Sequence, residues 1–282
     1  MKNEEWLKTI SGVNMPRLIY GTAWKKKRTA ELVVKAVEAG FRGIDTACQP
    51  KHYSEPLVGK ALQHLQDKGY KRENLFIQTK FTPLKGQDPN NIPYDKHANP
   101  GIQVAQSFEV SQKNLRTDYV DTLVLHSPLA SHQLLMTVWQ AMEVIYNAGG
   151  AYQLGISNCY NLAVLKNLYE DARIKPAIVQ NRFHDKTRFD IELRKWCAGK
   201  GIIYQSFWTL TANPHILASD TVAGIAKQLH KTPAQILFGY LTQCGIVPLT
   251  GTRSEQHMIE ALDVVRFELS SEEMERVGRL LV

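Results

Sequence analysis

The sequence lacks a long hydrophobic segment, a dense cysteine pattern and a signal-like N-terminus. Among its 282 residues there is no run of about 18 or more apolar residues, so no transmembrane helix is expected. The opening stretch MKNEEWLKTISG carries acids where a signal peptide needs an apolar core, so we expect a cytoplasmic protein. The four cysteines are scattered without CxxC or zinc-like spacing, which predicts reduced thiols and no metal site.

The charge is positive but is not gathered into one stripe. Lys and Arg outnumber Asp and Glu by 34 to 27, giving a formal net charge of +7. Without a long basic stripe, no nucleic-acid partner is predicted. We interpret the densest run, Lys25–Arg28, as a solvated loop, and the alternative is a contact for an anionic ligand. A positive surplus also suits an enzyme whose cofactor carries phosphates.

Short apolar segments alternate with helical segments along the whole chain. The expected strands cover residues 17–23, 41–46, 75–80, 120–126, 152–157, 177–183, 201–207 and 245–251. Strict alternation predicts parallel strands with crossover helices, and eight such units predict a closed (β/α)₈ TIM barrel with its active site at the C-terminal face. Neither GxGxxG nor GxxxxGK[ST] occurs. With no linker or composition break, residues 1–282 are predicted to form one domain, with residues 1–16 capping the barrel floor.

Ionisable residues stand at the C-terminal ends of three consecutive strands. They are Asp45, Lys80 and His126. A buried Lys or Asp is rare unless it is paired, so we expect Asp45 and Lys80 to form a pair at the barrel mouth beside His126. Tyr53 follows in the same loop as Asp45, and a nearby ammonium would lower the pKa of its phenol from about 10. Tyr53 is therefore predicted to donate a proton, with His126 orienting a carbonyl oxygen.

Reduction of a carbonyl by this set would need an electron source. No protein side chain delivers hydride, so a reductase requires a nicotinamide cofactor. An alternative class is a metal-dependent barrel hydrolase using Asp45 and His126. The sequence offers it no second strand-end His and no carboxylate cluster with ligand spacing.

Several motifs in order carry a family resemblance over nearly the whole chain. They are GFRGIDTA at 40–47, Tyr53 with Glu55 and Val58–Gly59, FIQTKF at 76–81, TDYVDTLVLHSP at 117–128, LGISN at 154–158, VQNRFH at 179–184 and VPLTGTRSEQHMIEAL at 247–262. With them the sequence resembles the aldo-keto reductase superfamily. The resemblance implies a (β/α)₈ barrel that binds NADPH, or NADH as the alternative, and reduces an aldehyde or ketone.

The resemblance also implies roles for individual positions. The catalytic tetrad falls on Asp45, Tyr53, Lys80 and His126. The expected cofactor contacts are Thr22, Asp45, Ser157, Asn158, Gln180, Phe207, Leu210, Thr250, Gly251, Thr252, Arg253, His257 and Glu260. Trp24, Trp208 and His126 are expected to contact the substrate, because the two tryptophans stand in loops beyond strand ends and would form aromatic walls.

Three departures from the family pattern affect these expectations. The gap from Asp45 to Tyr53 is longer than in many members, so the extra segment must bulge if Tyr53 is to reach Lys80. Many members have a Lys-Ser pair where this chain has Leu249–Thr250, which leaves Arg253 as the main cation for a 2′-phosphate. Ala261 replaces an asparagine that often contacts the adenine.

Alternative interpretations stay open for several of these residues. Ser157 and Asn158 could simply cap the following helix, and Gln180 could be a core amide with satisfied hydrogen bonds. The whole barrel could also be a nucleotide-binding, catalytically weak module of a regulatory or channel-subunit kind. The expected partner is a small carbonyl compound, without nucleic acid or membrane, and the expected state is a monomer or weak homodimer.

Overall fold

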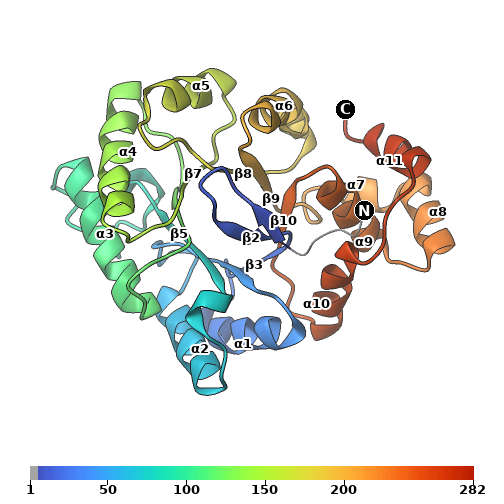
Figure 1. The fold of residues 1–282 in the computed structure, drawn as a ribbon, viewed down its shortest axis with the longest axis horizontal. Helices are drawn as coiled ribbons and strands as arrows, with labels where there is room; N and C mark the ends of the chain where they lie inside the picture. Colours follow the sequence, from blue (N-terminus) through green and yellow to red (C-terminus); the bar gives the residue numbers. More distant parts are fainter. Residues whose placement is uncertain (1–5) are drawn as a thin grey trace.

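A closed barrel of parallel strands forms the centre of the structure, a computed structural model that describes residues 6–282 (Figure 1). Its strands are β3 (Ile19–Gly21), β4 (Gly43–Asp45), β5 (Phe76–Phe81), β6 (Thr122–Leu125), β7 (Leu154–Ser157), β8 (Ile178–Arg182), β9 (Ile203–Phe207) and β10 (Val247–Thr250). Each strand pairs with the next, and β10 closes the ring by placing Leu249 opposite Ile19. The predicted (β/α)₈ TIM barrel is confirmed.

Helices surround the barrel and alternate with its strands (Figure 1). They are α1 (Thr29–Ala39), α2 (Glu55–Asp67), α3 (Pro100–Leu115), α4 (His132–Asn147), α5 (Leu162–Asp171), α6 (Ile191–Gly199), α7 (Pro214–Leu217), α8 (Asp220–Leu229), α9 (Pro233–Gln243), α10 (Glu255–Leu262) and α11 (Ser271–Gly278). Side chains cap several of the first turns, as Asn161 does for α5 and Ser254 for α10. Within residues 6–282, no helix is both long and apolar enough to cross a membrane.

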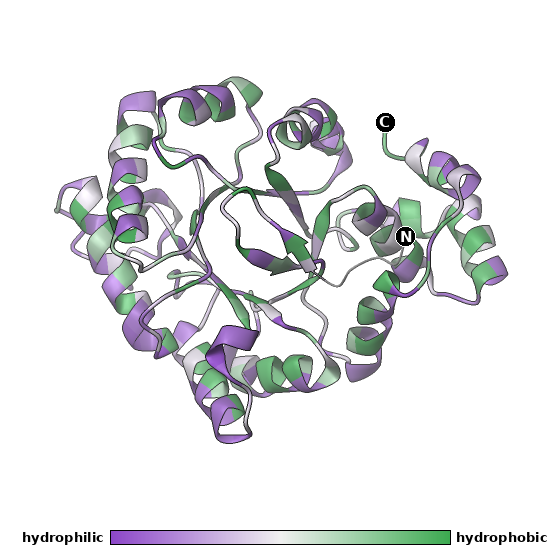
Figure 2. Ribbon diagram, in the orientation of Figure 1, coloured by the Kyte–Doolittle hydropathy of each residue, from purple (hydrophilic) through white to green (hydrophobic). Residues whose placement is uncertain are grey.

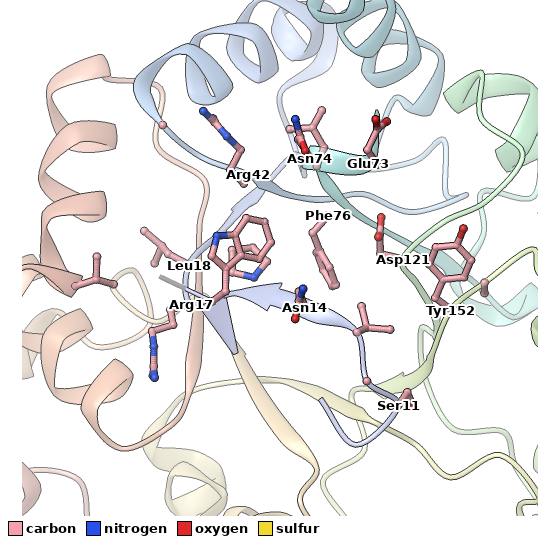
Figure 3. Close-up of a pocket in the computed structure, with 18 of the residues that line it drawn as sticks. Ser11, Asn14, Arg17, Leu18, Arg42, Glu73, Asn74, Phe76, Asp121 and Tyr152 are labelled. Carbon is pink, nitrogen blue, oxygen red and sulfur yellow. The ribbon is translucent and has the colours of Figure 1, made fainter. Parts of the chain in front are cut away.

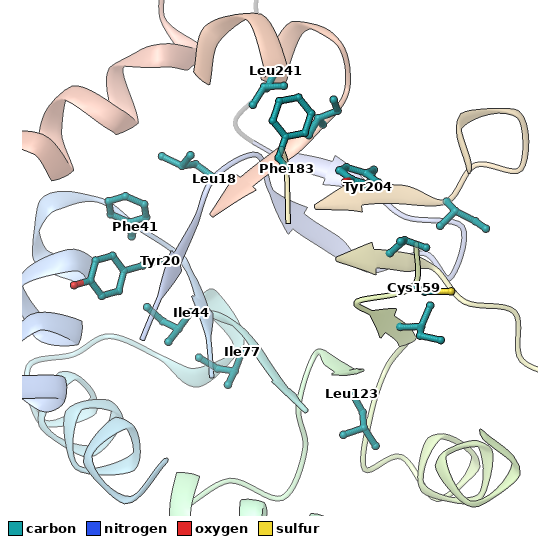
Figure 4. Close-up of a cluster of buried hydrophobic side chains, with 14 of the residues drawn as sticks. Leu18, Tyr20, Phe41, Ile44, Ile77, Leu123, Cys159, Phe183, Tyr204 and Leu241 are labelled. Atoms are coloured by element: carbon teal, nitrogen blue, oxygen red, sulfur yellow. The ribbon is translucent and has the colours of Figure 1, made fainter. Parts of the chain in front are cut away.

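The main core lies between the strands and the surrounding helices. Tyr20, Ile44, Ile77 and Leu123 point outward from neighbouring strands into this layer (Figure 4). Each helix adds an apolar face, and Figure 2 shows hydrophobic and hydrophilic residues interspersed along the helices. Because side chains alternate along a strand, the residues between these outward positions point into the barrel.

A hairpin covers the N-terminal end of the barrel. It consists of the antiparallel strands β1 (Trp6–Lys8) and β2 (Asn14–Pro16). Met15 packs with Ile19, Phe76 and other residues at the strand starts. Residues 1–5 of the expected cap lie outside the described residues, and we propose that the hairpin and barrel together make one domain.

A pocket opens beside this hairpin, at the end of the barrel opposite the polar strand ends. Arg17, Arg42, Phe76 and Asp121 are among its lining residues (Figure 3). The N-terminal face of such barrels serves stability, whereas the chemistry is built at the C-terminal face. The candidate active site therefore lies at the other end, where the polar residues follow the strands.

Candidate active site

A buried ion pair stands at the C-terminal end of the barrel. The ammonium of Lys80 donates to both carboxylate oxygens of Asp45, at 2.6 and 2.7 Å, and to the carbonyl oxygen of Thr46 at 2.8 Å. Lys80 is 1 % exposed and Asp45 is 3 % exposed. Burial lowers the pKa of Lys80, and the charge of Asp45 beside it opposes this shift.

The loop after Asp45 brings Tyr53 to this pair. The extra residues fold into a turn in which the amides of His52 and Tyr53 both donate to the Gln49 carbonyl oxygen at 3.0 Å. The Gln49 side chain in turn donates to the carbonyl oxygen of Gly86 at 2.6 Å. As a result the Tyr53 ring lies 5.1 Å from Lys80 Nζ and 6.0 Å from the His126 ring, measured to ring centroids.

His52, the neighbour of Tyr53, takes a different direction. Its ring packs against the Trp24 ring at a tilt of 36°, with 3.9 Å between the ring centroids, and its carbonyl oxygen accepts from the Trp24 amide at 2.8 Å. The inserted segment therefore separates the two side chains. Tyr53 points towards the ion pair, whereas His52 packs under the loop that follows β3.

The acidity of Tyr53 differs from the sequence-based expectation. Burial raises the pKa of Tyr53, and the charge of Asp45 raises it further. The expected net lowering of this pKa is wrong for this structure, because burial and the charge of Asp45 set its direction. The Tyr53 hydroxyl therefore keeps its proton at neutral pH.

His126 faces the same space as a neutral imidazole. Burial lowers the pKa of His126 well below its usual value, and the nearby charges of Lys80 and His52 lower it further. Its Nδ1 lies 2.6 Å from the Thr82 hydroxyl. If that hydroxyl donates to Nδ1, the proton of the ring is on Nε2, which can then donate to a carbonyl oxygen.

The residues expected to hold a carboxamide lie at the ends of β7 and β8. Asn158 adopts a left-handed backbone conformation, with φ of 53°, and its side chain donates to the His126 carbonyl oxygen at 2.8 Å and to Ser157 Oγ at 3.2 Å. The cap of α5 is Asn161, so neither Ser157 nor Asn158 caps that helix. Asparagine adopts this backbone conformation more readily than most residues.

Gln180 has a double character. Its amide nitrogen donates inside the barrel, to Asp45 Oδ1 at 3.0 Å and to Gln205 Oε1 at 2.9 Å. Its oxygen makes no hydrogen bond to the described residues and is not fully buried. Gln180 is thus bonded in the core through its nitrogen and remains open to a ligand through its oxygen.

The loop after β10 is tied to the loop after β3 by two cations. Arg253 donates to the Trp24 carbonyl oxygen at 3.0 Å, and the ammonium of Lys25 donates to the carbonyl oxygen of Gly251. Lys25 is 7 % exposed, so the solvated-loop interpretation is wrong for this residue, although Lys26 and Lys27 are exposed. Burial and the charge of Arg253 lower the pKa of Lys25 to about 8.

Lys25 has no carboxylate partner among the described residues. None of the ion pairs there includes it. A buried cation next to a second cation is costly unless an anion can approach both. Leu249, in contrast, packs in the inner apolar cluster and offers no charge.

The remaining expected cofactor residues lie around these positions. Thr22 is buried and its hydroxyl donates to the Asp45 carbonyl oxygen at 2.9 Å. Phe207 and Leu210 are partly buried at the end of β9 and in the loop beyond it. Thr250, Gly251 and Thr252 follow from the end of β10. His257 and Glu260 lie on α10, where Glu260 accepts from Gln256 at 3.0 Å, and the structure does not join them to the tetrad.

Two exposed tryptophans flank the strand ends. Trp24 and Trp208 are each 48 % exposed, and both have left-handed backbone conformations. The guanidinium of Arg182, from the end of β8, lies 4.2 Å from the centroid of the Trp208 ring. The structure thus presents exposed aromatic surfaces beyond β3 and β9, and their contact with a substrate stays a prediction.

Sequence reasoning named Lys25 only in the alternative interpretation of its basic run, and it missed three residues that touch the candidate site. Thr82 gave no clear signal, because its partner, His126, comes from another strand end. Gln78 and Gln205 did give one: Gln78 precedes Lys80 by two positions and Gln205 precedes Phe207 by two. Residues two apart on a strand face the same side, so both glutamines face the barrel interior.

The fold and the site together define a class of protein, a (β/α)₈ barrel with a tyrosine beside a buried Lys–Asp ion pair at the C-terminal ends of its strands. The model of the Aldo/keto reductase family matches residues 17–214, and the chain belongs to this family. A glyoxal reductase of Bacillus subtilis (strain 168) is 29% identical over 280 residues, which cover 98% of this chain and 93% of the relative.

Solved structures agree with this assignment. An aldo-keto reductase from a Medee basin deep-sea metagenome library superposes with a TM-score of 0.83 at 27% identity, covering 97% of this chain and 94% of that one. A silkworm (Bombyx mori) aldo-keto reductase, crystallised with NADPH, shares the fold with a TM-score of 0.82 at 22% identity, over 99% of this chain and 88% of its own. The chain is an oxidoreductase of the carbonyl-reducing aldo-keto class.

Proposed function

We propose that this protein reduces an aldehyde or ketone to an alcohol with NADPH, and that Tyr53 donates the proton. The observation that carries the proposal is the closeness of the Tyr53 ring to both Lys80 Nζ, at 5.1 Å, and the His126 ring, at 6.0 Å, beside the ion pair with Asp45. The hydroxyl of Tyr53 makes no hydrogen bond to any described residue. It is therefore free to bond a substrate oxygen.

The residues present fit nicotinamide adenine dinucleotide phosphate. Lys25 and Arg253 supply two cations without a carboxylate between them, which suits a phosphate. Ser157, Asn158 and Gln180 supply hydroxyl and amide groups, which suit a carboxamide. When bound, the nicotinamide supplies the hydride. NADH is the alternative, and it would make less use of the two cations.

The chain's own groups then divide the work of proton transfer. Asp45 holds Lys80 charged beneath Tyr53, and this ammonium stabilises the phenolate that forms when Tyr53 gives up its proton. Neutral His126 donates to the carbonyl oxygen and orients it towards Tyr53. Trp24 and Trp208 provide apolar walls that exclude water from one side of the substrate.

Replacing Thr82 by Val tests the orientation of His126. The variant loses the hydroxyl on Nδ1, so the imidazole can rotate or change tautomer, and we expect kcat/KM for a carbonyl compound to fall by about 10- to 100-fold. Steady-state kinetics and a thermal melt measure both effects. Thr79→Val is the matched control, because Thr79 is a buried threonine of β5, the strand that ends just before Thr82, and its hydroxyl donates to Glu55. A Thr82→Val enzyme with the control's kcat/KM would refute this role.

Replacing Lys25 by Met tests the phosphate contact through pH. The protonated lysine binds the anion, so the wild type should bind NADPH more tightly than the variant does. This difference in affinity should be largest below pH 8 and shrink above it. The phosphate is already doubly charged there, because its second pKa is about 6. The unfolded chain holds this proton more tightly than the folded one, so wild-type stability should rise relative to Lys25→Met from about pH 8 to 10. An advantage independent of pH would argue against the contact.

The proposed function itself is tested by nucleotide titration followed by a substrate screen. Quenching of tryptophan fluorescence reports binding of NADPH and of NADH, and a carbonyl panel with the tighter cofactor reports turnover. Binding of NADPH with reduction of at least one aldehyde or ketone is expected. The name of the Bacillus relative makes dicarbonyl compounds such as glyoxal a sensible start.

A catalytically weak binding module is the second candidate. Two observations favour it: the Lys80 ammonium is fully engaged by Asp45 and Thr46, and the Tyr53 hydroxyl is held by no hydrogen bond to the described residues. Tight NADPH binding without turnover across the panel would select this candidate over the reductase.

A further inference from the structure

Three buried glutamines form a network directly beneath Asp45. Gln78 and Gln205 are 0 % exposed and Gln180 is 3 % exposed, and they come from β5, β9 and β8. The strand register explains why they meet. Gln78 pairs with Asp45 across β4 and β5, and Gln180 pairs with Gln205 across β8 and β9.

The charge of Asp45 sets the orientation of all three amides. An ionised carboxylate only accepts hydrogen bonds, so Gln78 and Gln180 both turn their nitrogens to Asp45 Oδ1, at 2.7 and 3.0 Å. Their second N–H groups then reach Gln205 Oε1, each at 2.9 Å.

Gln205 is therefore forced to place its oxygen towards its two neighbours. Its nitrogen donates to Gln78 Oε1 at 3.0 Å and to the sulfur of Met15 at 3.3 Å. Every N–H of the three amides has an acceptor inside the barrel. The Gln180 oxygen is the one polar atom of these amides that receives no bond within the network.

We propose that Gln78 and Gln205 are positioning residues, which fix the Asp45 carboxylate and hold Gln180 with its oxygen presented to the nicotinamide carboxamide. The inference rests on the proposed function. It adds that one network holds both Asp45, which supports the proton donor through Lys80, and Gln180, which would contact the cofactor ring. Gln78 acts through Asp45 on Lys80, and Gln205 acts through Gln180.

The test compares ligands that do and do not carry a nicotinamide. Gln205→Met keeps the side-chain volume but removes the acceptor that turns Gln180. We expect the dissociation constant for NADPH to rise about 10-fold and that for 2′,5′-ADP to stay within about twofold, both by fluorescence titration. We also expect kcat to fall about 10- to 100-fold. Gln78→Met should lower kcat similarly with a smaller effect on NADPH, and it carries the test if Gln205→Met does not fold.

Gln153→Met is the matched control. Gln153 is a buried amide at the opposite end of the barrel, where it accepts from Thr9 at 2.6 Å and donates to Thr122 at 2.8 Å. Its loss should lower the melting temperature but leave kcat and both dissociation constants within about twofold. Equal weakening of NADPH and 2′,5′-ADP by Gln205→Met, or kcat values like the control's, would overturn the inference.

The two levels of the proposal fail in different ways. If the wild type binds NADPH but reduces no carbonyl, the reductase assignment is wrong, and the ligand comparison still decides the role of Gln205. If the wild type binds neither nucleotide, the proposed function fails and this inference fails with it. If the wild type is active and the glutamine variants behave like the control, only the inference is wrong.

Discussion

Tyr53→Phe is expected to reduce the rate of carbonyl reduction by about 10²- to 10⁴-fold, while NADPH binds within about twofold of the wild type. The substitution removes one oxygen and keeps the ring that lies near Lys80 and His126. Only the proton donor is lost, so the loss should appear in kcat. Steady-state kinetics with a fluorescence titration separates the two quantities.

Tyr204→Phe provides the control for this experiment. Tyr204 is a buried tyrosine of β9 on the outer face of the barrel, and its hydroxyl donates to Asp190 at 2.8 Å (Figure 4). Its loss should affect stability and not turnover. If the proton instead comes from His52, then His52→Gln will cost more than Tyr53→Phe, and the role given to Tyr53 is wrong.

The pH dependence gives a second check on the same residue. Burial and Asp45 raise the pKa of Tyr53, so the hydroxyl stays protonated through neutral and mildly alkaline pH. The rate of reduction should therefore not fall between about pH 6 and 9 through loss of this proton. A fall centred near neutral pH that disappears in Tyr53→Phe would mean that the pKa is lowered in the complex.

The barrel itself could be predicted from the sequence because its signal is repeated. Strict alternation of short apolar strands with helices leaves few other topologies, and each strand end is marked by the change from apolar to polar residues. That is why Asp45, Lys80 and His126 could be placed at one end of the barrel before the structure was known.

The path of the loop that carries Tyr53 could not be predicted in the same way. Its turn is held by the hydrogen bond from the Gln49 side chain to Gly86 and by the contact of the His52 ring with Trp24, and both partners come from other loops. Contacts of this kind have no local signature. The burial of Lys25 was missed for the same reason, because its acceptor, Gly251, lies at the far end of the chain.

The largest expected effect on stability comes from Lys80→Met. It leaves the Asp45 carboxylate buried without its counter-charge, with only Gln78 and Gln180 donating to it from the side chains. Removing one partner of a buried ion pair lowers the free energy of unfolding by about 3–5 kcal/mol. Reduction should be lost as well, because nothing then stabilises the Tyr53 phenolate. Urea unfolding measures the first effect and the carbonyl assay the second.

A second ion pair of the same length, but more exposed, separates the effect of burial on stability from the effect of distance. Lys231 and Asp263 also lie 2.6 Å apart, but their side chains are 25% and 26% exposed. Lys231→Met should therefore cost only about 1 kcal/mol and leave turnover unchanged. Adding Asp45→Asn to Lys80→Met should recover part of the lost stability, because the uncompensated charge is gone, but none of the activity. If Lys80→Met unfolds at the same urea concentration as Lys231→Met, then water or another group compensates Asp45, and the ion pair is not what holds the proton-donor site together.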